Sequence, residues 1–462
     1  MSFPKYETYK DSGVEWLGEV PKHWNVEPLK RSCQIFPSNV DKKSYEEQIP
    51  VLLCNYTDVY YNEEIVSGMQ LMSATATKEQ IEKFTLQAGD VVFTKDSESA
   101  DDIAIAAYIP QDLSGVICGY HLSVVRSSAE TDGAFVKRFF DSQSAKAYFA
   151  VSANGLTRVG LSQYATDNIP TPIPPLSEQT QIARFLDYET ARIDELIAEQ
   201  ERLIALLKEK RQAVISHAVT KGCDRAVPMK DSGVEWLGEV PEHWQLTKLK
   251  FVVERIVDCP HETPVYDLDG DYLVIRTADV DKGTLKTDSM YHLNCEEYLN
   301  RIRREPLNKD DIVYGREGER WGHAALVPTS DLFALGQRMM QFRAERNICS
   351  SFLTFQLNSV STYRQGDVDT VGATSPHVNI STIRNYQLMM PPFDEQFSIS
   401  KYLQEISVAL DSLIEEAINA TEILQERRSA LISAAVTGKI DVRNWQPPAD
   451  TPSNAASAIN HH

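Results

Sequence analysis

The sequence of 462 residues lacks the features of several common protein classes. No apolar run approaches the roughly 20 residues that a helix needs to cross a bilayer, and the first ten residues form no signal-peptide core. The seven cysteines are odd in number and never occur as Cys-x-x-Cys, which argues against a disulfide framework and against a structural zinc site. These absences predict a cytoplasmic protein with reduced thiols and no membrane segment.

Motifs for catalysis are also missing. There is no Gly-x-Gly loop, and Thr437-Gly438-Lys439-Ile440 lacks the glycine-rich lead and the Ser/Thr of a phosphate-binding loop. Met390-Pro391-Pro392-Phe393 has the shape of an amino-methyltransferase motif, but an apolar Met occupies the position that must bond the target amino group. Ten dispersed histidines suggest no metal-ligand cluster. We therefore predict no catalytic residue, no metal site and no cofactor bound by this chain.

Positive charge is scarce. The chain has 46 Lys and Arg against 66 Asp and Glu, a net charge of −20. Proteins that bind nucleic acid alone usually carry a basic surface. Any nucleic-acid binding by this chain must therefore use local cations or cations from partner subunits.

What the sequence does contain is an internal repeat. Residues 10–21 recur letter for letter as 230–241, and His23-Trp24 recurs as His243-Trp244. Pro174-Pro175-Leu-Ser-Glu-Gln179 has a counterpart 217 residues later in Pro391-Pro392-Phe-Asp-Glu-Gln396. The chain is a tandem duplication of a unit of roughly 220 residues. Because both copies of the tryptophans (Trp16, Trp24, Trp236, Trp244) are identical, we interpret them as packing anchors rather than as base-stacking residues.

Between these repeated blocks lie two diverged middle regions, at about 22–172 and 242–389. Both contain short β-like runs, such as 50–54 and 90–93 in the first and 272–275 and 311–314 in the second. Landmarks align between them although the loops differ. A retained scaffold with changed loops is typical of a recognition domain.

A long helix follows each Pro-Pro pair, and we expect Ser177 or Asp394 to cap it. From about 177 to 220 such a helix would be about 65 Å long. The apolar residues follow a heptad seam that breaks at Lys210 and at Arg427. Each helix could pack on its own domain, but the matching registers favour an antiparallel pairing of the two. The expected seams are Leu186, Glu189, Ile193, Leu196, Gln200, Leu203, Leu207, Lys210 and Val214, and Leu403, Ile406, Leu410, Leu413, Ala417, Ala420, Leu424, Arg427 and Leu431.

The second middle region contains a glycine-bounded loop, residues 314–322, with two arginines, an acid and an indole. Arg can bond guanine bidentately and Glu can accept from cytosine, although a solvated turn with surface ion pairs is the simpler interpretation for any one residue. Arg301, Arg303 and Arg304 could meet phosphates. The candidate contact residues here are Arg316, Glu317, Arg320, Trp321, Arg338 and Arg343. In the first region, where the equivalent loop is less basic, they are Thr94, Lys95, Ser97, Tyr120, His121, Arg158, Ser162 and Gln163.

These motifs together resemble one family, the specificity subunits of type I restriction–modification systems. The resemblance rests on the repeated Lys-Asp-Ser-Gly-Val-Glu-Trp-Leu-Gly-Glu-Val-Pro-x-His-Trp segment, on Pro-Pro-Leu-Ser-Glu-Gln-x-x-Ile-Ala, on Gly-Asp-Val-Val-Phe, and on Gly-Ala-Thr-Ser-Pro-His-Val-Asn-Ile-Ser. It covers residues about 8–440. One departure is Asp310, where the family usually has Gly. The last motif adds Ser375, His377 and Asn379 to the candidate DNA-binding residues.

The resemblance implies a mixed α/β fold: two tandem target-recognition domains with twisted mixed sheets, joined by two long helices in an antiparallel coiled coil with a pseudo-twofold. The expected boundaries are 1–172 and 223–389 for the domains, 173–222 and 390–440 for the helices, and 441–462 for a disordered tail.

The resemblance also implies a division of labour. Each domain would read one half of a split target in double-stranded DNA. Two methyltransferase subunits, which modify adenine N6, and motor–nuclease restriction subunits would be the partners. S-adenosylmethionine, ATP and Mg²⁺ would belong to those partners. Two alternatives stay open: the recognition subunit of another methyltransferase–nuclease type, and a coiled-coil adaptor that binds proteins and no DNA.

Overall fold

The computed structural model describes residues 3–368, 370 and 376–448. The chain forms two compact units, and each unit contains half of each long helix. Unit 1 comprises Met1–Gln200 and Asn419–His462, and unit 2 comprises Glu201–Ile418. In the part of the chain that is described, no helix is long and apolar enough to cross a membrane.

Unit 1 contains a four-stranded antiparallel sheet of order β4-β11-β7-β9 and a mixed three-stranded sheet of order β10-β5-β6. Its strands are β1 (Tyr9–Asp11), β2 (Glu19–Pro21), β3 (Asn25–Pro28), β4 (Cys33–Pro37), β5 (Ile49–Cys54), β6 (Met72–Ala76), β7 (Val91–Thr94), β8 (Asp96–Ser97), β9 (Ala106–Tyr108), β10 (Val116–Cys118), β11 (Leu122–Ser127), β12 (Val159–Gly160) and β13 (Pro170–Ile173). Its shorter helices are α1 (Tyr56–Tyr60), α2 (Lys78–Phe84), α3 (Gly133–Phe140), α4 (Gln143–Ser152) and α5 (Gln163–Asn168).

Unit 2 repeats this topology, with sheets of order β17-β25-β22-β23 and β21-β18-β24. Its strands are β14 (Met229–Asp231), β15 (Glu239–Pro241), β16 (Gln245–Lys248), β17 (Val253–Asp258), β18 (Tyr272–Ile275), β19 (Val280–Asp281), β20 (Thr284–Leu285), β21 (Tyr291–Leu293), β22 (Ile312–Gly315), β23 (Ala324–Leu326), β24 (Phe333–Leu335), β25 (Met339–Ala344) and β26 (Gln387–Met390). Its shorter helices are α7 (Cys295–Ile302), α8 (Ser350–Leu357), α9 (Val360–Asp367) and α10 (Ile380–Arg384). The prediction that the two diverged middle regions share one fold is thus confirmed.

The identical repeat forms the same antiparallel hairpin in both units, β1–β2 and β14–β15. The tryptophan that follows each hairpin is fully buried and bonds the long helix. Trp24 Nε1 donates to Glu178 Oε1 at 3.1 Å, and Trp244 Nε1 donates to Glu395 Oε1 at 3.1 Å. This hydrogen bond therefore joins the repeated blocks at the two ends of each domain.

Two long helices, α6 (Leu176–Lys221) and α11 (Phe393–Val436), carry the domains. The expected caps at Ser177 and Asp394 are wrong, because each helix begins at the preceding residue, directly after the second proline. The glutamines of the repeated motif bond the first proline of the pair that precedes each helix. Gln179 Nε2 donates to Pro174 O at 2.8 Å, and Gln396 Nε2 donates to Pro391 O at 2.9 Å.

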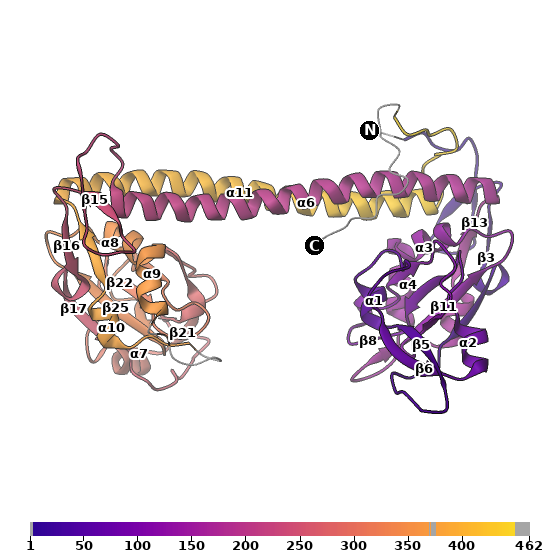
Figure 1. The fold of residues 1–462 in the computed structure, drawn as a ribbon, viewed down its shortest axis with the longest axis horizontal. Helices are drawn as coiled ribbons and strands as arrows, with labels where there is room; N and C mark the ends of the chain where they lie inside the picture. The colour runs from indigo at the N-terminus through magenta and orange to yellow at the C-terminus, as the bar shows by residue number, and fades with distance from the viewer. Residues whose placement is uncertain (1–2, 369, 371–375, 449–462) are drawn as a thin grey trace. The chain divides into compact units, whose positions relative to one another are not determined.

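Within each unit the two helix segments run antiparallel, side by side (Figure 1). In unit 1 Arg428 Nε donates to Asp194 at 2.8 Å, and the earlier part of α6 packs with the later part of α11. In unit 2 Arg211 Nε lies 3.3 Å from Asp411 Oδ1, and the end of α6 packs with the start of α11. The buried residues are Ile182, Phe185, Leu186, Ile432, Ala435 and Val436 in unit 1, and Ile215, Ala218, Val219, Ile399 and Leu403 in unit 2.

The expected seam positions Leu186, Ile193, Leu403, Leu410 and Ala417 are buried, but the expectation is wrong at several of the positions between them. Leu196, Leu203 and Leu413 are 45%, 43% and 47% exposed, and the isoleucine that follows each of them is the more buried residue. The seam therefore breaks at Arg211 and Arg428, one residue later than expected.

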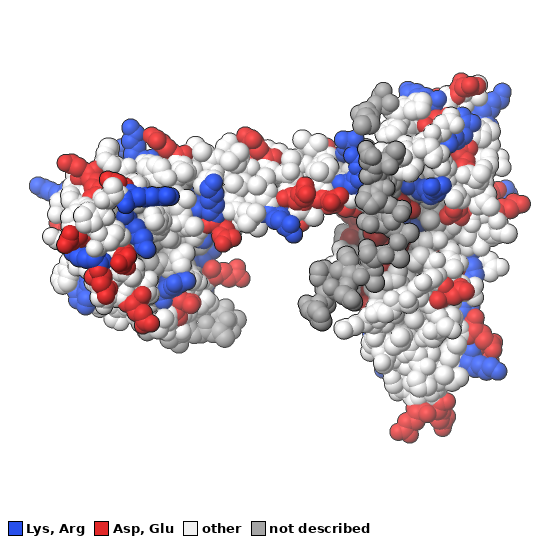
Figure 2. Space-filling model, turned by 45° about the horizontal axis from the view of Figure 1, so that its top comes forward, with Lys and Arg blue, Asp and Glu red and all other residues white. Residues whose placement is uncertain are grey.

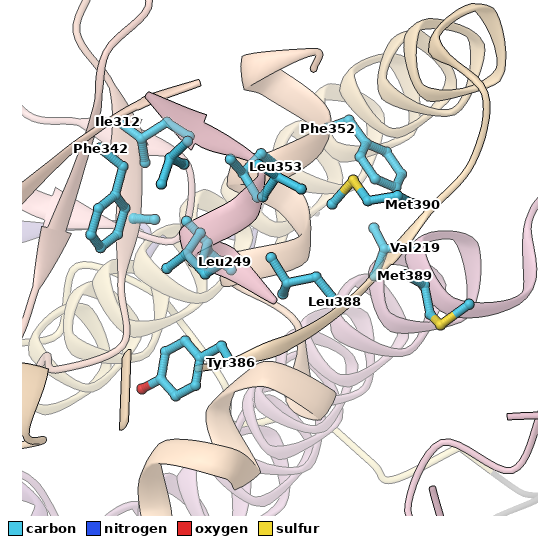
Figure 3. Close-up of a cluster of buried hydrophobic side chains, with 14 of the residues drawn as sticks. Val219, Leu249, Ile312, Phe342, Phe352, Leu353, Tyr386, Leu388, Met389 and Met390 are labelled. Carbon is cyan, nitrogen blue, oxygen red and sulfur yellow. The ribbon is translucent and has the colours of Figure 1, made fainter. Parts of the chain in front are cut away.

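The core of each unit joins its domain to its helix segments. Figure 3 shows the hydrophobic core of unit 2, in which Val219 of α6 lies with Leu388 and Met390 of β26 and with Phe352 of α8. Burial of these apolar side chains is the main force that holds the domain on the helices.

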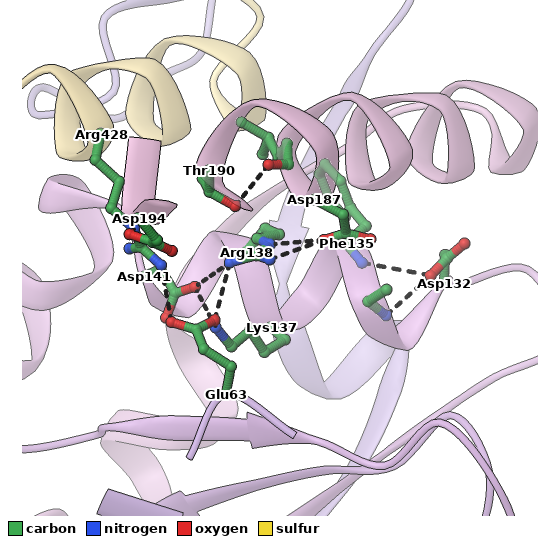
Figure 4. A network of polar contacts seen from close by, with 12 residues as sticks. Glu63, Asp132, Phe135, Lys137, Arg138, Asp141, Asp187, Thr190, Asp194 and Arg428 are labelled. Atoms are coloured by element: carbon green, nitrogen blue, oxygen red, sulfur yellow. Dashed lines mark hydrogen bonds and ion pairs between the residues drawn. The ribbon is translucent and has the colours of Figure 1, made fainter. Parts of the chain in front are cut away.

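Unit 1 adds a charged network at the same junction (Figure 4). Arg138 of α3 donates to Glu63 at 3.0 Å and to Asp187 of α6 at 2.8 Å. Arg428 of α11 donates to the same Glu63 at 2.9 Å, and Lys137 also bonds Glu63. In α8, the counterpart of α3, the equivalent positions hold Thr354 and Phe355, so the network is particular to unit 1.

The expectation of a disordered tail from residue 441 is wrong for residues 441–448. Val442 is buried, and Trp445 packs edge-on against Phe185 with ring centroids 5.2 Å apart. Gln181 Nε2 donates to the Trp445 carbonyl at 2.7 Å. The rest of the tail, 449–462, lies outside the described residues.

Candidate nucleic-acid interface

In unit 2 the candidate loop connects β22 to β23, and it is tied to two other segments. Arg316 N donates to Arg338 O at 2.8 Å, and Val378 N donates to Arg316 O at 3.2 Å. Glu317 and His377 face each other in an isolated antiparallel bridge. Backbone pairing thus brings together four candidates from three segments, which we call the unit 2 cluster: Arg316, Glu317, Arg338 and His377.

The charged groups of this cluster surround one carboxylate. Arg316 Nη2 donates to Glu317 Oε1 at 2.5 Å, and Arg338 Nε lies 3.9 Å from Glu317 Oε2. Arg316 Nε is buried and makes no hydrogen bond within the described residues, with Asp258 Oδ1 3.7 Å away. Arg338 is half exposed and has a positive φ of 69°. The carboxylate is therefore held between two guanidinium groups that retain unused donors.

In unit 1 the equivalent loop follows β7. Lys95 Nζ donates to Asp96 Oδ2 at 2.8 Å, and His121 Nδ1 lies 3.1 Å from the same oxygen. Lys95 Nζ also lies 4.9 Å from the centroid of the exposed Tyr120 ring. Partial burial acts to raise the pKa of Asp96, but hydrogen bonds from Lys95 and His121 outweigh it and lower that pKa. The unit 1 cluster is Lys95, Asp96, Tyr120 and His121.

The two clusters occupy equivalent places in the fold. The acid of each cluster pairs through its backbone with an equivalent residue of the duplication. Asp96 pairs with Gly160, and Glu317 pairs with His377, which lies 217 residues after Gly160. Each cluster places one acid between two basic side chains. One comes from the acid's own loop, and the other comes from the turn before β11 or β25. The residue types differ at every position. Equivalent placement with different donors and acceptors is the geometry that two different half-sites need.

Several candidates lie near the clusters but are engaged with the protein. Arg320 Nη1 donates to Ala278 O at 2.8 Å. Ser162 caps α5 by accepting from Ala165 N, and Gln163 Nε2 donates to Ile35 O at 2.9 Å. Asn379 precedes α10 and is exposed, as is Arg158 next to β12. Ser375 lies outside the described residues.

Other candidates are parts of the scaffold, which corrects the prediction that they read DNA. Thr94 and Ser97 are buried, and Thr94 Oγ1 accepts from Ile105 N at 3.1 Å. Trp321 is buried and stacks on Tyr363 at 4.2 Å. The side chains of these residues are unavailable to a base edge.

Arg343 is also structural. It donates to both oxygens of the buried Asp311 at 2.9 and 2.8 Å, and these hydrogen bonds, with one to Glu305, raise its pKa despite some desolvation. Arg126 makes the same two-pronged contact with Asp90 in unit 1. Arg301 is buried and donates to three backbone carbonyls, so it meets no phosphate.

Sequence reasoning missed the acids at the centre of the unit 1 cluster and beside the unit 2 cluster, Asp96 and Asp258. Asp96 was detectable, because it aligns with Glu317 and follows Lys95 as Glu317 follows Arg316. Figure 2 shows acidic and basic side chains interspersed on the face it presents rather than a continuous basic stripe. Within the described residues, no group of His, Cys, Asp and Glu could hold a metal ion.

Residues 21–205 and 241–422 each match the family described as the type I restriction modification DNA specificity domain. The chain therefore belongs to this family and carries its domain twice.

Among its relatives is the EcoKI specificity subunit of Escherichia coli K12, a type I restriction enzyme subunit, which is 22% identical over 96% of this chain and 95% of that protein. The MjaVIII specificity subunit of Methanocaldococcus jannaschii is also 22% identical, over 96% of this chain and 98% of that protein.

Solved structures share the fold. A chain from a study of complex assembly and conformational transition in the type I R-M system superposes with a TM-score of 0.69 at 16% identity, over 90% of this chain and 98% of that chain. The HsdS subunit from Thermoanaerobacter tengcongensis gives a TM-score of 0.51 at 16% identity, over 91% and 98%. The predicted family and the fold of two tandem domains with long helices are confirmed.

Proposed function

We propose that this chain is the DNA sequence-specificity subunit of a type I restriction–modification complex, and that each domain reads one half of a bipartite target. The observation that carries the proposal is the pair of equivalent clusters with changed chemistry. The scaffold ion pairs Asp90–Arg126 and Asp311–Arg343 are the same in both copies, whereas the clusters differ in residue type.

The clusters suit readout in the major groove. Arg316 can bond guanine O6 and N7, and Glu317 can accept from cytosine N4. Lys95 and Asp96 likewise supply a donor and an acceptor, on shorter side chains. Because each acid is already fixed by neighbouring cations, little side-chain freedom is lost when a base edge replaces one of those partners.

The family of the chain implies a division of labour, and the charge and the missing catalytic motifs agree with it. With a net charge of −20, the isolated chain binds DNA weakly, and partner subunits supply most phosphate contacts. The partners are two methyltransferase subunits, which act on adenine N6, and motor–nuclease subunits. S-adenosylmethionine, ATP and Mg²⁺ belong to them, and this chain contributes no catalytic group. The two helices form an antiparallel coiled coil that sets the spacing between the half-sites in the cytoplasmic complex.

Domain exchange tests the proposal. Residues 22–172 are replaced by the corresponding domain of another family member, and N6-methyladenine is mapped in DNA from cells that also express the methyltransferase. One half of the methylated motif is expected to change while the other half stays the same. A motif that changes in both halves, or in neither, contradicts the proposal.

A further inference from the structure

Equivalent positions on the two long helices differ in what covers them. Phe185 of α6 and Tyr402 of α11 are 217 residues apart in the duplication. Phe185 is fully buried, because Phe3 and Trp445 pack on it with ring centroids at 5.1 and 5.2 Å. Tyr402 is 43% exposed. Unit 1 thus covers this position with aromatic side chains from both ends of the chain, and unit 2 leaves it open.

A second difference lies at the neighbouring glutamate. Glu178 accepts hydrogen bonds from His23, Trp24 and the hydroxyl of Tyr6, and its side chain is 5% exposed. Glu395 has only the equivalent histidine and tryptophan among the described residues, and its side chain is 30% exposed. A donor that unit 1 provides through Tyr6 is therefore missing in unit 2.

The cause is connectivity. In unit 1 two separate segments, residues 3–9 and 438–448, reach this site. In unit 2 the single connection 222–229 takes the place of both, and nearly all of it is exposed. It leaves a pocket of about 410 Å³, whose lining includes Ala213, Val214, His217, Ala218, Arg225 and Tyr402.

The pocket has a defined chemistry. From α6 it is lined by the apolar Ala213, Val214 and Ala218 and by His217, and from α11 by Tyr402. Arg225, which also lines the pocket, is exposed and makes no ion pair within the described residues, so an acidic group suits it. A Cβ atom at Gly222, which also lines the pocket, would lie 3.7 Å from Glu395 Oε1, so a donor suits the other side. An aromatic side chain between an acid and a donor complements this surface.

The chain's own last residues do not meet these requirements. Residues 449–462 contain no Phe, Tyr or Trp. Trp445, which has the right side chain, is already packed on unit 1. The occupant must therefore come from another protein that contacts the helices.

We propose that the unit 2 pocket binds an extended segment of the partner methyltransferase, with an aromatic side chain against Tyr402, a donor to Glu395 and an acid to Arg225. This inference rests on the proposed function for the identity of the partner. Because unit 1 fills its own equivalent site, only the methyltransferase on unit 2 can dock in this way. The two copies of that partner are therefore held unequally by a chain built from two similar halves.

A peptide tests whether the pocket accepts such a segment. The probe is the chain's own covering segment, residues 438–448, synthesised with a fluorophore and titrated into the intact chain. We expect saturable binding, at least tenfold weaker for the peptide with Trp445→Ala and for the chain with Tyr402→Ser. Phe397→Ser is the matched control, because Phe397 is exposed on the same helix and does not line the pocket. Binding that is absent, or that tolerates Trp445→Ala, overturns the proposal.

Thiol protection tests the source of the segment. Cys223 lines the pocket, and Cys295 is a second exposed thiol of unit 2 away from it. In the complex with the methyltransferase, maleimide labelling of Cys223 is expected to slow at least tenfold while labelling of Cys295 is unchanged. Tyr402→Ser should restore Cys223 labelling. Equal labelling of Cys223 with and without the methyltransferase overturns the proposal even if the peptide binds. Mapping of the methylated DNA motif separately reports on the proposed function.

Discussion

At the scale of single residues, the candidate interface consists of an acid held between two basic side chains. The same arrangement recurs in the two units with Lys95, Asp96 and His121 in one and with a guanidinium on each side of Glu317 in the other. Ion pairs of this kind contribute little stability when they are partly exposed. Their value to the protein lies in presenting donors and acceptors in a fixed geometry.

Asp310 provides a residue-scale prediction about stability. It has a φ of 67° where its counterpart Gly89 has a φ of 86°, a conformation that costs a non-glycine residue roughly 1 kcal/mol. Asp310→Gly should therefore stabilise unit 2, but by no more than about 0.5 kcal/mol, because the greater freedom of glycine in the unfolded chain offsets roughly 0.5–1 kcal/mol of the relief. Native-state hydrogen exchange of β22 and β25 measures this change in the stability of unit 2.

Gly89→Asp is the matched control and should destabilise unit 1 by a similar amount, since a Cβ atom there meets nothing within 4 Å. An Asp310→Gly chain with unchanged or faster exchange in β22 would contradict the strain argument.

Residue roles were predictable where the duplication supplied a comparison. Trp24 and Trp244 are identical in both copies, and their assignment as packing anchors is confirmed by full burial. Trp16 and Trp236, which were assigned the same role, are 38% and 37% exposed, so the assignment does not hold for them. Arg343 was assigned to DNA from its charge alone. Its counterpart in the first copy is also an arginine, Arg126, and both copies keep an aspartate, Asp90 or Asp311, so a structural ion pair was already indicated. Trp321 could not be excluded in this way, because the residue that buries it, Tyr363, is distant in sequence and has no aromatic counterpart in unit 1.

At the scale of elements, the strands and long helices followed from the sequence, but the seam register did not. Adjacent apolar pairs such as Leu196-Ile197 and Leu413-Ile414 fit a 3.5-residue period in either register. Two residues that distinguish the observed register, Thr190 and Ser407, are polar but buried. A search for an apolar pattern therefore cannot find them.

The junction of α3 with the long helices gives a pH-dependent prediction. Burial acts to raise the pKa of Glu63, but the charges of Lys137, Arg138 and Arg428 outweigh it and lower that pKa to about 2 from an ordinary value of 4.5. A carboxyl with a lowered pKa stabilises the fold above its unfolded value, and this contribution is lost as the pH falls from 4.5 towards 2. Glu63→Gln should remove that part of the acid sensitivity of unit 1.

Hydrogen exchange of α3 at pH 6 and pH 3 measures this effect, with α8 of unit 2 as an internal reference. The wild-type chain should lose more protection in α3 on acidification than Glu63→Gln does. Equal losses in the two chains would show that the network contributes no stability at this junction.

At the scale of the whole molecule, one scaffold is built twice with two different readouts. In the proposed complex the helices fix the distance between the half-sites. Insertion of one heptad into both α6 and α11 lengthens each helix by about 10 Å, which corresponds to roughly three base pairs of B-DNA. The spacer of the methylated motif should grow by that amount, with both half-sites unchanged.

A heptad inserted into one helix only is the control, because it destroys the match between the two seams and should abolish methylation. A spacer that stays the same in the doubly lengthened chain would show that the helices do not set the distance.

The central claim, that each cluster reads its own half of one DNA target, is tested most directly by mapping N6-methyladenine in cells that express the methyltransferase. The chains compared are none, wild type, Arg316→Ala and Lys95→Ala. We predict a bipartite motif that requires the chain and that relaxes in one half only for Arg316→Ala and in the other half only for Lys95→Ala, at a cost of about 1–3 kcal/mol for the affected base pair. A motif that persists without the chain, or variants that relax both halves alike, would contradict the account.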